Sequence, residues 1–168
     1  LKERIFDKVP FKSVHYLNGQ DPDPIHACQV YEKVLSEFPV DIVFMGIGEN
    51  GHIAFNDPPA DFDTKQAYII VNLDSRCKKQ QVGEGWFKDE DEVPRQAVSM
   101  TPYQIMQCAH LISPVPHKVK ADAVKKVLSA KTVDPMVPGS LLKTHPDFQL
   151  FLDEESAANC SEEMLAGN

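Results

Sequence analysis

The fold of this chain is decided by residues 40–58, which read VDIVFMGIGENGHIAFNDP. The first six of them, Val40–Met45, form an almost continuous apolar run, and such runs are typical of a central strand in a parallel sheet. The glycine-rich loop Gly46–Asp57 therefore follows the carboxyl end of a strand. Open α/β sheets bind their ligands at that edge, so this loop is the first candidate for a functional site.

Strand-like and helix-like segments alternate on both sides of this run. The alternation predicts an α/β fold, in the form of a three-layer α/β sandwich of Rossmann-like type with a mainly parallel sheet. Residues 1–168 suffice for a single domain with its own core. The predicted strands are 14–17, 40–45, 67–73, 97–100, 110–115 and 148–152, with 67–73 a second run of the central parallel type. The predicted helices are 24–38, 75–82, 101–108, 116–130, 138–144 and a last one capped by Asp153.

Acidic residues outnumber basic ones by 25 to 17, which gives a net charge of −8. Phosphates repel such a surface, so we expect no nucleic-acid partner and no membrane partner, although a local cluster of donors can still bind a phosphorylated small molecule. The four cysteines are scattered, as expected for reduced thiols in a cytoplasmic protein and not for a disulfide framework or a zinc site. The N-terminal segment has neither a methionine nor a secretory signal, and we expect it to be the end of a helix from a longer chain.

The loop Gly46–Asp57 admits more than one function. Its glycines match the pattern G-x-G-x-x-G of dinucleotide sites, but Pro58 and Pro59 follow closely and disfavour the helix that such a site requires. Histidine is a common proton-transfer group, and Asp57 lies close enough in sequence to orient the ring of His52 across a folded loop. The structural alternative is that His52 only hydrogen-bonds a neighbouring carbonyl.

The motif Gly-x-Gly-x-x-Gly-His-Ile-Ala-Phe-Asn-x-Pro resembles the signature loop of glucosamine-6-phosphate deaminases. The resemblance extends over residues 14–153, and its further landmarks are Leu17-Asn18-Gly19, Asp74-x-Arg76, Pro94-x-x-Ala97, Lys118 and Leu142-x-x-His145-Pro146. The related 6-phosphogluconolactonases share the fold, but their loop resembles Gly-x-Gly-x-Asp-Gly-His. Residues 54–56, Ala-Phe-Asn, therefore favour the deaminase branch.

The resemblance implies an enzyme that converts glucosamine 6-phosphate to fructose 6-phosphate and ammonia, by aldose–ketose isomerisation with deamination. It implies that His52 opens the sugar ring, with Asp57 and Asn50 as its catalytic partners, and that the reaction uses neither a metal nor an organic cofactor. The resemblance also implies that the substrate and its phosphate are bound by Gly48, Gly51, Lys118 and Arg76. The implied partner is a phosphorylated sugar, and a homo-oligomer is one arrangement that the family allows.

This sequence also departs from the family pattern. Asn50 stands where the best-known members have aspartate, Asp57 where they have glutamate, and Gln81 where they have a phosphate-binding arginine. The family's N-terminal phosphate loop and the Asp-Glu segment that supplies the enolisation base do not occur in residues 1–168. We therefore expect an N-terminally incomplete member that is inactive as a deaminase by itself. A 6-phosphogluconolactonase-like hydrolase and a non-catalytic sugar-phosphate-binding protein are the alternatives.

Overall fold

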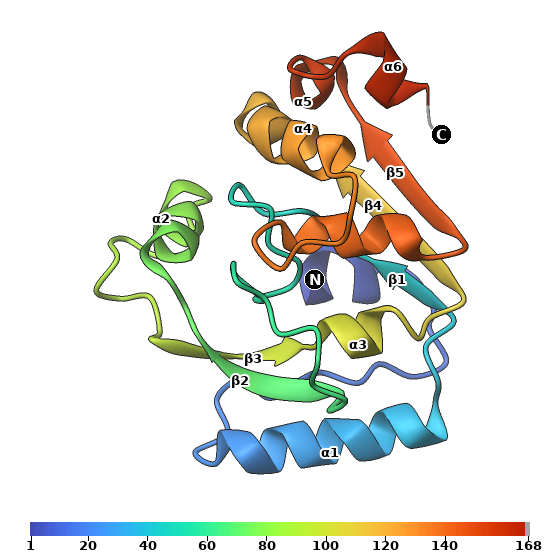
Figure 1. The fold of residues 1–168 in the computed structure, drawn as a ribbon. Coiled ribbons are helices and arrows are strands. Elements are labelled where there is room, and N and C mark those ends of the chain that lie inside the picture. The colour runs from blue at the N-terminus through green and yellow to red at the C-terminus, as the bar shows by residue number, and fades with distance from the viewer. Residues whose placement is uncertain (167–168) are drawn as a thin grey trace.

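A three-stranded parallel sheet is the framework of the computed structural model, which describes residues 1–166 (Figure 1). Its strands are β1 (Ile42–Phe44), β4 (His110–Val115) and β5 (Phe148–Leu152), in the order β1-β4-β5 with both pairs parallel. The predicted α/β fold, with a parallel sheet and flanking helices, is confirmed. The strand predicted over 40–45 is present as the shorter β1, and its carboxyl end leads directly into the glycine-rich loop.

Helical segments connect and flank these strands. They are η1 (Lys2–Phe6), α1 (Pro24–Glu37), α2 (Ser75–Gly83), α3 (Pro102–Ile105), η2 (Lys118–Lys120), α4 (Ala121–Ser129), η3 (Pro138–Thr144), α5 (Glu154–Ala157) and α6 (Glu162–Leu165). The main core collects buried side chains from the loop after β1, from β4, α4 and η3: Ile47, Ile53, Leu111, Val115, Val124, Val127 and Leu142. The candidate loop thus contributes two of its own residues to the core, which fixes its position relative to the sheet.

Two further strands form a separate sheet. β2 (Tyr68–Asn72) and β3 (Gln96–Met100) pair with each other in antiparallel register. The prediction that residues 67–73 form a central parallel strand is wrong, because within residues 1–166 β2 has β3 as its only strand partner and lies against α1. The ring of Tyr68 meets that of Tyr31 on α1 edge-on, with 5.4 Å between centroids. This contact buries one end of β2 and leaves its middle only partly covered.

Two other predicted elements differ in the structure. Residues 14–17 are not a strand, and Tyr16 is largely exposed, because this stretch has no strand beside it in the described part of the chain. The helix predicted from Pro116 begins only at Ala121, after the short turn η2. The reason is local: His117 has a φ of +81°, outside the helical region, and its N–H donates to Asp153 Oδ2 at 2.9 Å.

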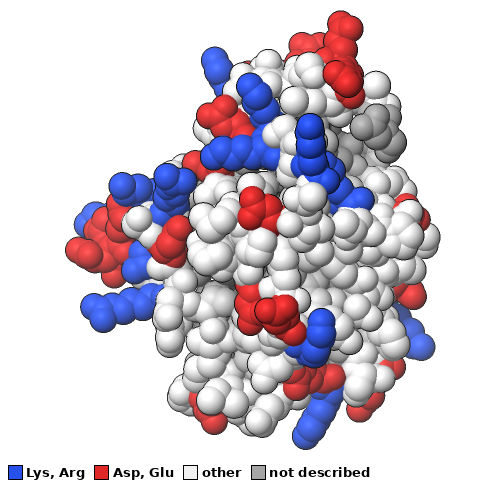
Figure 2. Space-filling view, viewed as in Figure 1, with Lys and Arg blue, Asp and Glu red and all other residues white. Residues whose placement is uncertain are grey.

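Charged side chains of both signs are dispersed over the face drawn in Figure 2 and leave a broad area with few charges near its middle. Basic and acidic groups gather together at the left margin, on the side where α2 lies in Figure 1. Among residues 1–166, no helix has the length and apolar character needed to cross a membrane.

Candidate active site

The loop after β1 depends on two of its glycines. Gly51 has a φ of +89°, a conformation that is easy for glycine and strained for other residues. Gly48 lies against the imidazole of His52, where a Cβ atom would come within 2.3 Å of the ring atoms Cε1 and Nε2. The loop closes on itself through Gly48 N–H to His52 O and Gly51 N–H to Gly48 O, both at 2.9 Å. These two glycines therefore shape the loop around the histidine.

His52, Asp57 and Asn50 meet in the structure, as the sequence led us to expect. His52 Nδ1 lies 3.0 Å from Asp57 Oδ1, and both side chains are almost fully buried. Among the described residues, however, Nδ1 has no hydrogen-bond partner of acceptable geometry. The contact between the two side chains is therefore one of charge and proximity, without a directional hydrogen bond.

Asn50 joins the histidine and the aspartate. Its Oδ1 accepts the backbone N–H of His52 at 2.9 Å, and its Nδ2 donates to Asp57 Oδ1 at 2.8 Å. An aspartate at this position could accept the first bond but could not donate the second. Asn50 and Asp57 are thus matched to each other, because the amide of the one holds the carboxylate of the other.

The charge on Asp57 is favoured by its neighbours. Burial acts to raise the pKa of this carboxyl, but the His52 ring, the Asn50 amide and the backbone N–H of Asp74 together outweigh burial and hold the pKa below its ordinary value. Asp57 is therefore a carboxylate near neutral pH. A carboxylate beside Nδ1 stabilises the charged imidazolium that forms when His52 takes up a proton.

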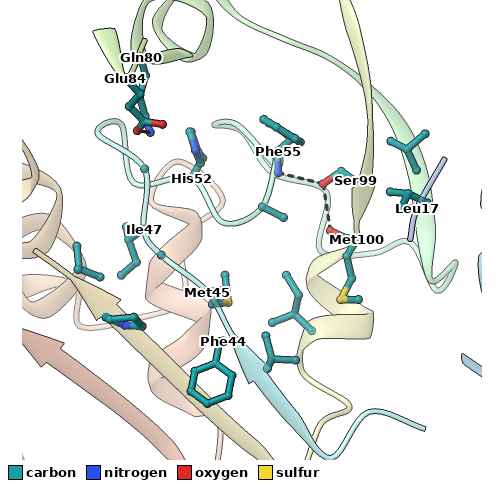
Figure 3. A pocket seen from close by; sticks show the side chains of 18 of the residues that line it. Leu17, Phe44, Met45, Ile47, His52, Phe55, Gln80, Glu84, Ser99 and Met100 are labelled. Carbon is teal, nitrogen blue, oxygen red and sulfur yellow. Dashed lines mark hydrogen bonds between the residues drawn. The ribbon is translucent and has the colours of Figure 1, made fainter. Parts of the chain in front are cut away.

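Three residues outside the predicted set anchor the loop. Asn56, which is buried, donates from Nδ2 to Ile53 O and to Met100 O, each at 2.8 Å. Ser99 on β3 accepts the N–H of Phe55 at 3.0 Å (Figure 3). Gly139 on η3 donates its N–H to Gly51 O at 3.0 Å, and a Cβ there would lie 2.7 Å from Val127 Cγ2. Asn56 stands inside the signature motif, so its position was visible in the sequence, whereas no local signal marks Ser99 or Gly139.

A cavity of about 1040 Å³ runs from His52 along the exposed side of β1 (Figure 3). Most of its lining is apolar, from residues such as Met45, Ile47 and Phe44, the last of which is 70% exposed. The polar side chains of the lining include His15, Gln80, Gln81, Glu84, Ser99, His117 and Lys120, and Figure 3 shows Gln80 and Glu84 on the side of His52. The cavity thus presents the His52 ring in a mainly apolar groove, with Gln80 and Glu84 on the same side.

The structure separates the predicted phosphate-binding residues from one another. Lys118 is exposed and lies outside the lining of the cavity, whereas Lys120, two residues later, lines it. Arg76 lines a smaller cleft of about 210 Å³ together with Asn50, Glu49 and Lys79. Among the described residues, Lys120 is the only lysine or arginine that borders the cavity of His52.

Lys120 is half-buried, and its environment disfavours an unpaired charge. Burial lowers the pKa of this ammonium group, and the carboxylates of Glu84 and Glu49 act in the opposite direction. Glu84 itself is held by donors from Gln80 Nε2 at 2.7 Å and Trp86 Nε1 at 3.0 Å. A desolvated ammonium group gains more from a bound anion than an exposed one does, which suits Lys120 to an anionic ligand.

Comparison with known proteins gives a consistent result. Residues 1–150 match the model of the family described as glucosamine-6-phosphate isomerases/6-phosphogluconolactonase. The glucosamine-6-phosphate deaminases of Bacillus cytotoxicus and of Bacillus cereus strain B4264 are each 33% identical over 162 residues, which is 96% of this chain and 60% of theirs. The chain therefore spans about 60% of the length of these curated relatives.

Solved structures extend the comparison to the fold. A monomeric glucosamine-6-phosphate deaminase superposes with a TM-score of 0.77 at 30% identity, over 85% of this chain and 58% of that one. The 6-phosphogluconolactonase of Trypanosoma brucei superposes with a TM-score of 0.70 at 20% identity, over 95% of this chain and 66% of that one. The second likeness concerns the fold alone.

Proposed function

Because this chain belongs to the family of glucosamine-6-phosphate isomerases and 6-phosphogluconolactonases, we propose that it acts on a phosphorylated amino sugar. The proposed reaction is that of a glucosamine-6-phosphate deaminase, which comprises ring opening, aldose–ketose isomerisation and loss of ammonia, and for residues 1–168 by themselves we propose the first of these steps. One observation carries the proposal: His52 borders the cavity while its Nδ1 is buried beside Asp57.

The first step requires a group that exchanges protons with the sugar. Since Nδ1 is enclosed, Nε2 is the ring nitrogen that remains for the substrate. In the proposed step it protonates the ring oxygen as the bond from that oxygen to C1 breaks, and the C1 hydroxyl gives up its proton to water to form the open-chain aldehyde. Asp57 stabilises the imidazolium form of His52, and Asn50 holds Asp57 in place. This assigns His52 as the acid–base group and the other two as positioning residues.

The phosphate group has a natural partner in Lys120. The ammonium group borders the same cavity as His52 and is half-buried, so a phosphate dianion would replace the water that it has lost. Gln81 lines the cavity as well and offers an amide donor. We therefore place the phosphate at Lys120, and not at Lys118 or at Arg76 in the neighbouring cleft.

The later isomerisation step needs a base to move a proton from C2 to C1. Among the described residues, Glu84 is the only acidic side chain that lines the cavity, and it is exposed and already bound to Gln80 and Trp86. We therefore do not assign Glu84 as the base that moves this proton. The test therefore separates ring opening, which we assign to the loop, from the steps that follow.

Ring opening is measured by the exchange between the α and β anomers of glucosamine 6-phosphate, followed by NMR magnetisation transfer. The chain should accelerate the exchange, and His52→Gln should lose about 10²–10⁴-fold of the acceleration, because an acid–base group is removed. His26→Gln, which changes an exposed histidine on α1, is the matched control and should leave the rate unchanged. Equal rates for the chain and for His52→Gln would contradict the role of His52.

Parallel assays distinguish the reaction class. Release of ammonia with formation of fructose 6-phosphate would establish deaminase activity. Hydrolysis of 6-phosphogluconolactone without release of ammonia would contradict the proposed deaminase and identify a lactonase. Binding of glucosamine 6-phosphate with neither anomer exchange nor turnover would contradict an enzymatic role and identify a sugar-phosphate-binding protein.

A further inference from the structure

A buried cysteine completes a group of three metal-ligating side chains behind His52. Cys77, in the first turn of α2, is 1% exposed. Its Sγ, a carboxylate oxygen of Asp57 and a ring nitrogen of His52 all lie within 4.8 Å of one another. The proposed reaction makes no use of Cys77, so its place beside the histidine and the aspartate requires a separate explanation.

The histidine nitrogen on this side is unsatisfied. Nδ1 is fully buried, lies 3.0 Å from Asp57 Oδ1 without a directional hydrogen bond, and has no other partner among the described residues. A buried polar atom of this kind costs free energy unless something binds to it. The lone pair of a neutral imidazole would be satisfied by a cation placed between these three side chains.

The three donors are held in place by different elements. Cys77 is fixed by the N-cap of α2, because its N–H donates to Asp74 Oδ1 at 2.6 Å. Asp57 is fixed by Asn50, and His52 by the close approach of Gly48. A set of one nitrogen, one oxygen and one sulfur donor suits a borderline divalent ion, with Zn²⁺ as the leading example, and is a poor match for Mg²⁺ or Ca²⁺.

We propose that His52, Asp57 and Cys77 bind a borderline divalent cation of the Zn²⁺ class, and that the bound ion withdraws the histidine and the aspartate from proton transfer. The ion bonds to the neutral imidazole, the carboxylate and the sulfur, and the thiol proton of Cys77 is released to solvent. Burial, with the charges of Asp57, Asp74 and Glu84, raises the pKa of free Cys77 to about 12, so the ion must displace a proton to bind. Metal binding stands independently of the proposed function, whereas inhibition by the metal rests on it.

A second group of potential ligands serves as an internal comparison. His117, Asp153 and Glu155 also lie within reach of one another, but all three are exposed. Asp153 already accepts the backbone N–H groups of His117 at 2.9 Å and Ser156 at 2.7 Å. This group therefore lacks the buried, unsatisfied atom that distinguishes the site at His52.

The probe is Co²⁺, because a thiolate bound to cobalt gives a charge-transfer band in the near ultraviolet and d–d bands that report the coordination geometry. Titration of the metal-free chain should produce both signals, and Zn²⁺ should remove them by competition. Cys77→Ser should abolish the charge-transfer band and weaken binding by more than about 100-fold, since loss of even an outer-shell partner typically costs 10–100-fold. Cys28→Ser, at another buried cysteine, and His117→Asn, at the exposed group, should both leave the spectrum unchanged.

A second measurement does not depend on any variant. In the unaltered chain, Zn²⁺ should shift the ¹⁵N resonance of Nδ1 of His52 and leave Nε2 unligated. A band that survives in Cys77→Ser, ligation through Nε2, or no spectral change in the unaltered chain would each overturn the site. If the metal binds as proposed but anomer exchange continues at its original rate, the metal site stands and the proposed inhibition is overturned, while His52→Gln tests the role of His52 separately.

Discussion

At the scale of single residues, the site depends on contacts that leave no room for larger side chains or for other charges. The ring of His52 lies between Gly48 on one side and the Asp57 carboxylate on the other. Asn50 connects the backbone of the histidine to that carboxylate. Each of these contacts can be tested by a substitution that adds or removes very few atoms.

Gly48→Ala should displace the histidine. The added Cβ would lie 2.3 Å from the ring, so the ring must move, and overpacking of this kind typically costs about 1–3 kcal/mol. Gly46→Ala is the matched control in the same loop, because its Cβ would meet only Pro114 O at an ordinary 3.9 Å. Urea unfolding measures the loss in free energy of unfolding, and the NMR resonances of the His52 ring report its displacement. Similar behaviour of the two variants would show that the ring is not packed on Gly48.

Asn50→Asp should destabilise the chain at neutral pH, even though the resemblance led us to expect an aspartate at this position. The new carboxylate would replace a donor 2.8 Å from Asp57 and place two partly buried negative charges together, at a cost of about 1–3 kcal/mol. Asn72→Asp, on an exposed position of β2, should cost far less, since it can still accept from Gln96. The measurement is the urea midpoint of each variant at neutral pH. An equal decrease of the midpoint in both variants would count against the Asn50–Asp57 pairing.

At the scale of elements, the parts that the sequence predicted well are those with local signals. The helices α1 and α2 begin where Asp23 and Asp74 accept backbone N–H groups from their first turns, and both caps are visible in the sequence. The strand partner of residues 67–73 was not predictable, because an apolar run is compatible with a central parallel strand and with a partly covered antiparallel one. Lys118 and Lys120 both lie in the short turn η2, but only Lys120 lines the cavity of His52. The sequence holds no signal that predicts which of the two lysines faces the cavity.

The carboxyl end of α4 depends on a lysine from another element. Lys143 Nζ donates to Val127 O at 3.3 Å, Leu128 O at 3.0 Å and Ala130 O at 2.6 Å, carbonyl groups that have no partner inside the helix. Lys143→Met should lower the free energy of unfolding by about 0.5–1.5 kcal/mol. Lys125→Met, on the exposed side of α4, should have little effect in the same urea titration. An equal effect of both variants would mean that these carbonyls do not need Lys143.

At the scale of the whole molecule, stability should depend on pH through its aspartates. Asp147 links β4 to β5 by its contact with His110, and this contact, with a further hydrogen bond from Gln149, lowers the pKa of Asp147. A carboxyl whose pKa is lowered by folding stabilises the folded chain above its unfolded pKa of 3.8, and this contribution is lost as the pH falls through the folded-state pKa.

We therefore expect the urea midpoint to decrease on acidification below about pH 4. The urea midpoint of Asp147→Asn should decrease less over the same pH interval, because this variant has no carboxyl to protonate at position 147. The urea midpoint of the exposed control Asp63→Asn should decrease as much as that of the unaltered chain. The difference should shrink in high salt, since both partners are exposed to solvent. Identical acid profiles for the chain and for Asp147→Asn would rule out a contribution from this pair.

The hydrogen bond from Gly139 to Gly51 has a consequence for how the protein emerges from the ribosome. The histidine loop is synthesised before the η3 segment that supports it, and β2, α2, β3, β4 and α4 lie between them in the sequence. Nascent chains that end before Pro138 therefore carry a loop that lacks one of its supports, and the core residues Ile47 and Ile53 lack the buried side chain of Leu142. Contacts between segments so distant in sequence form late in folding. The site should consequently mature only after η3 has been translated, and stalled nascent chains should show the loop as a protease-sensitive segment until η3 has left the exit tunnel.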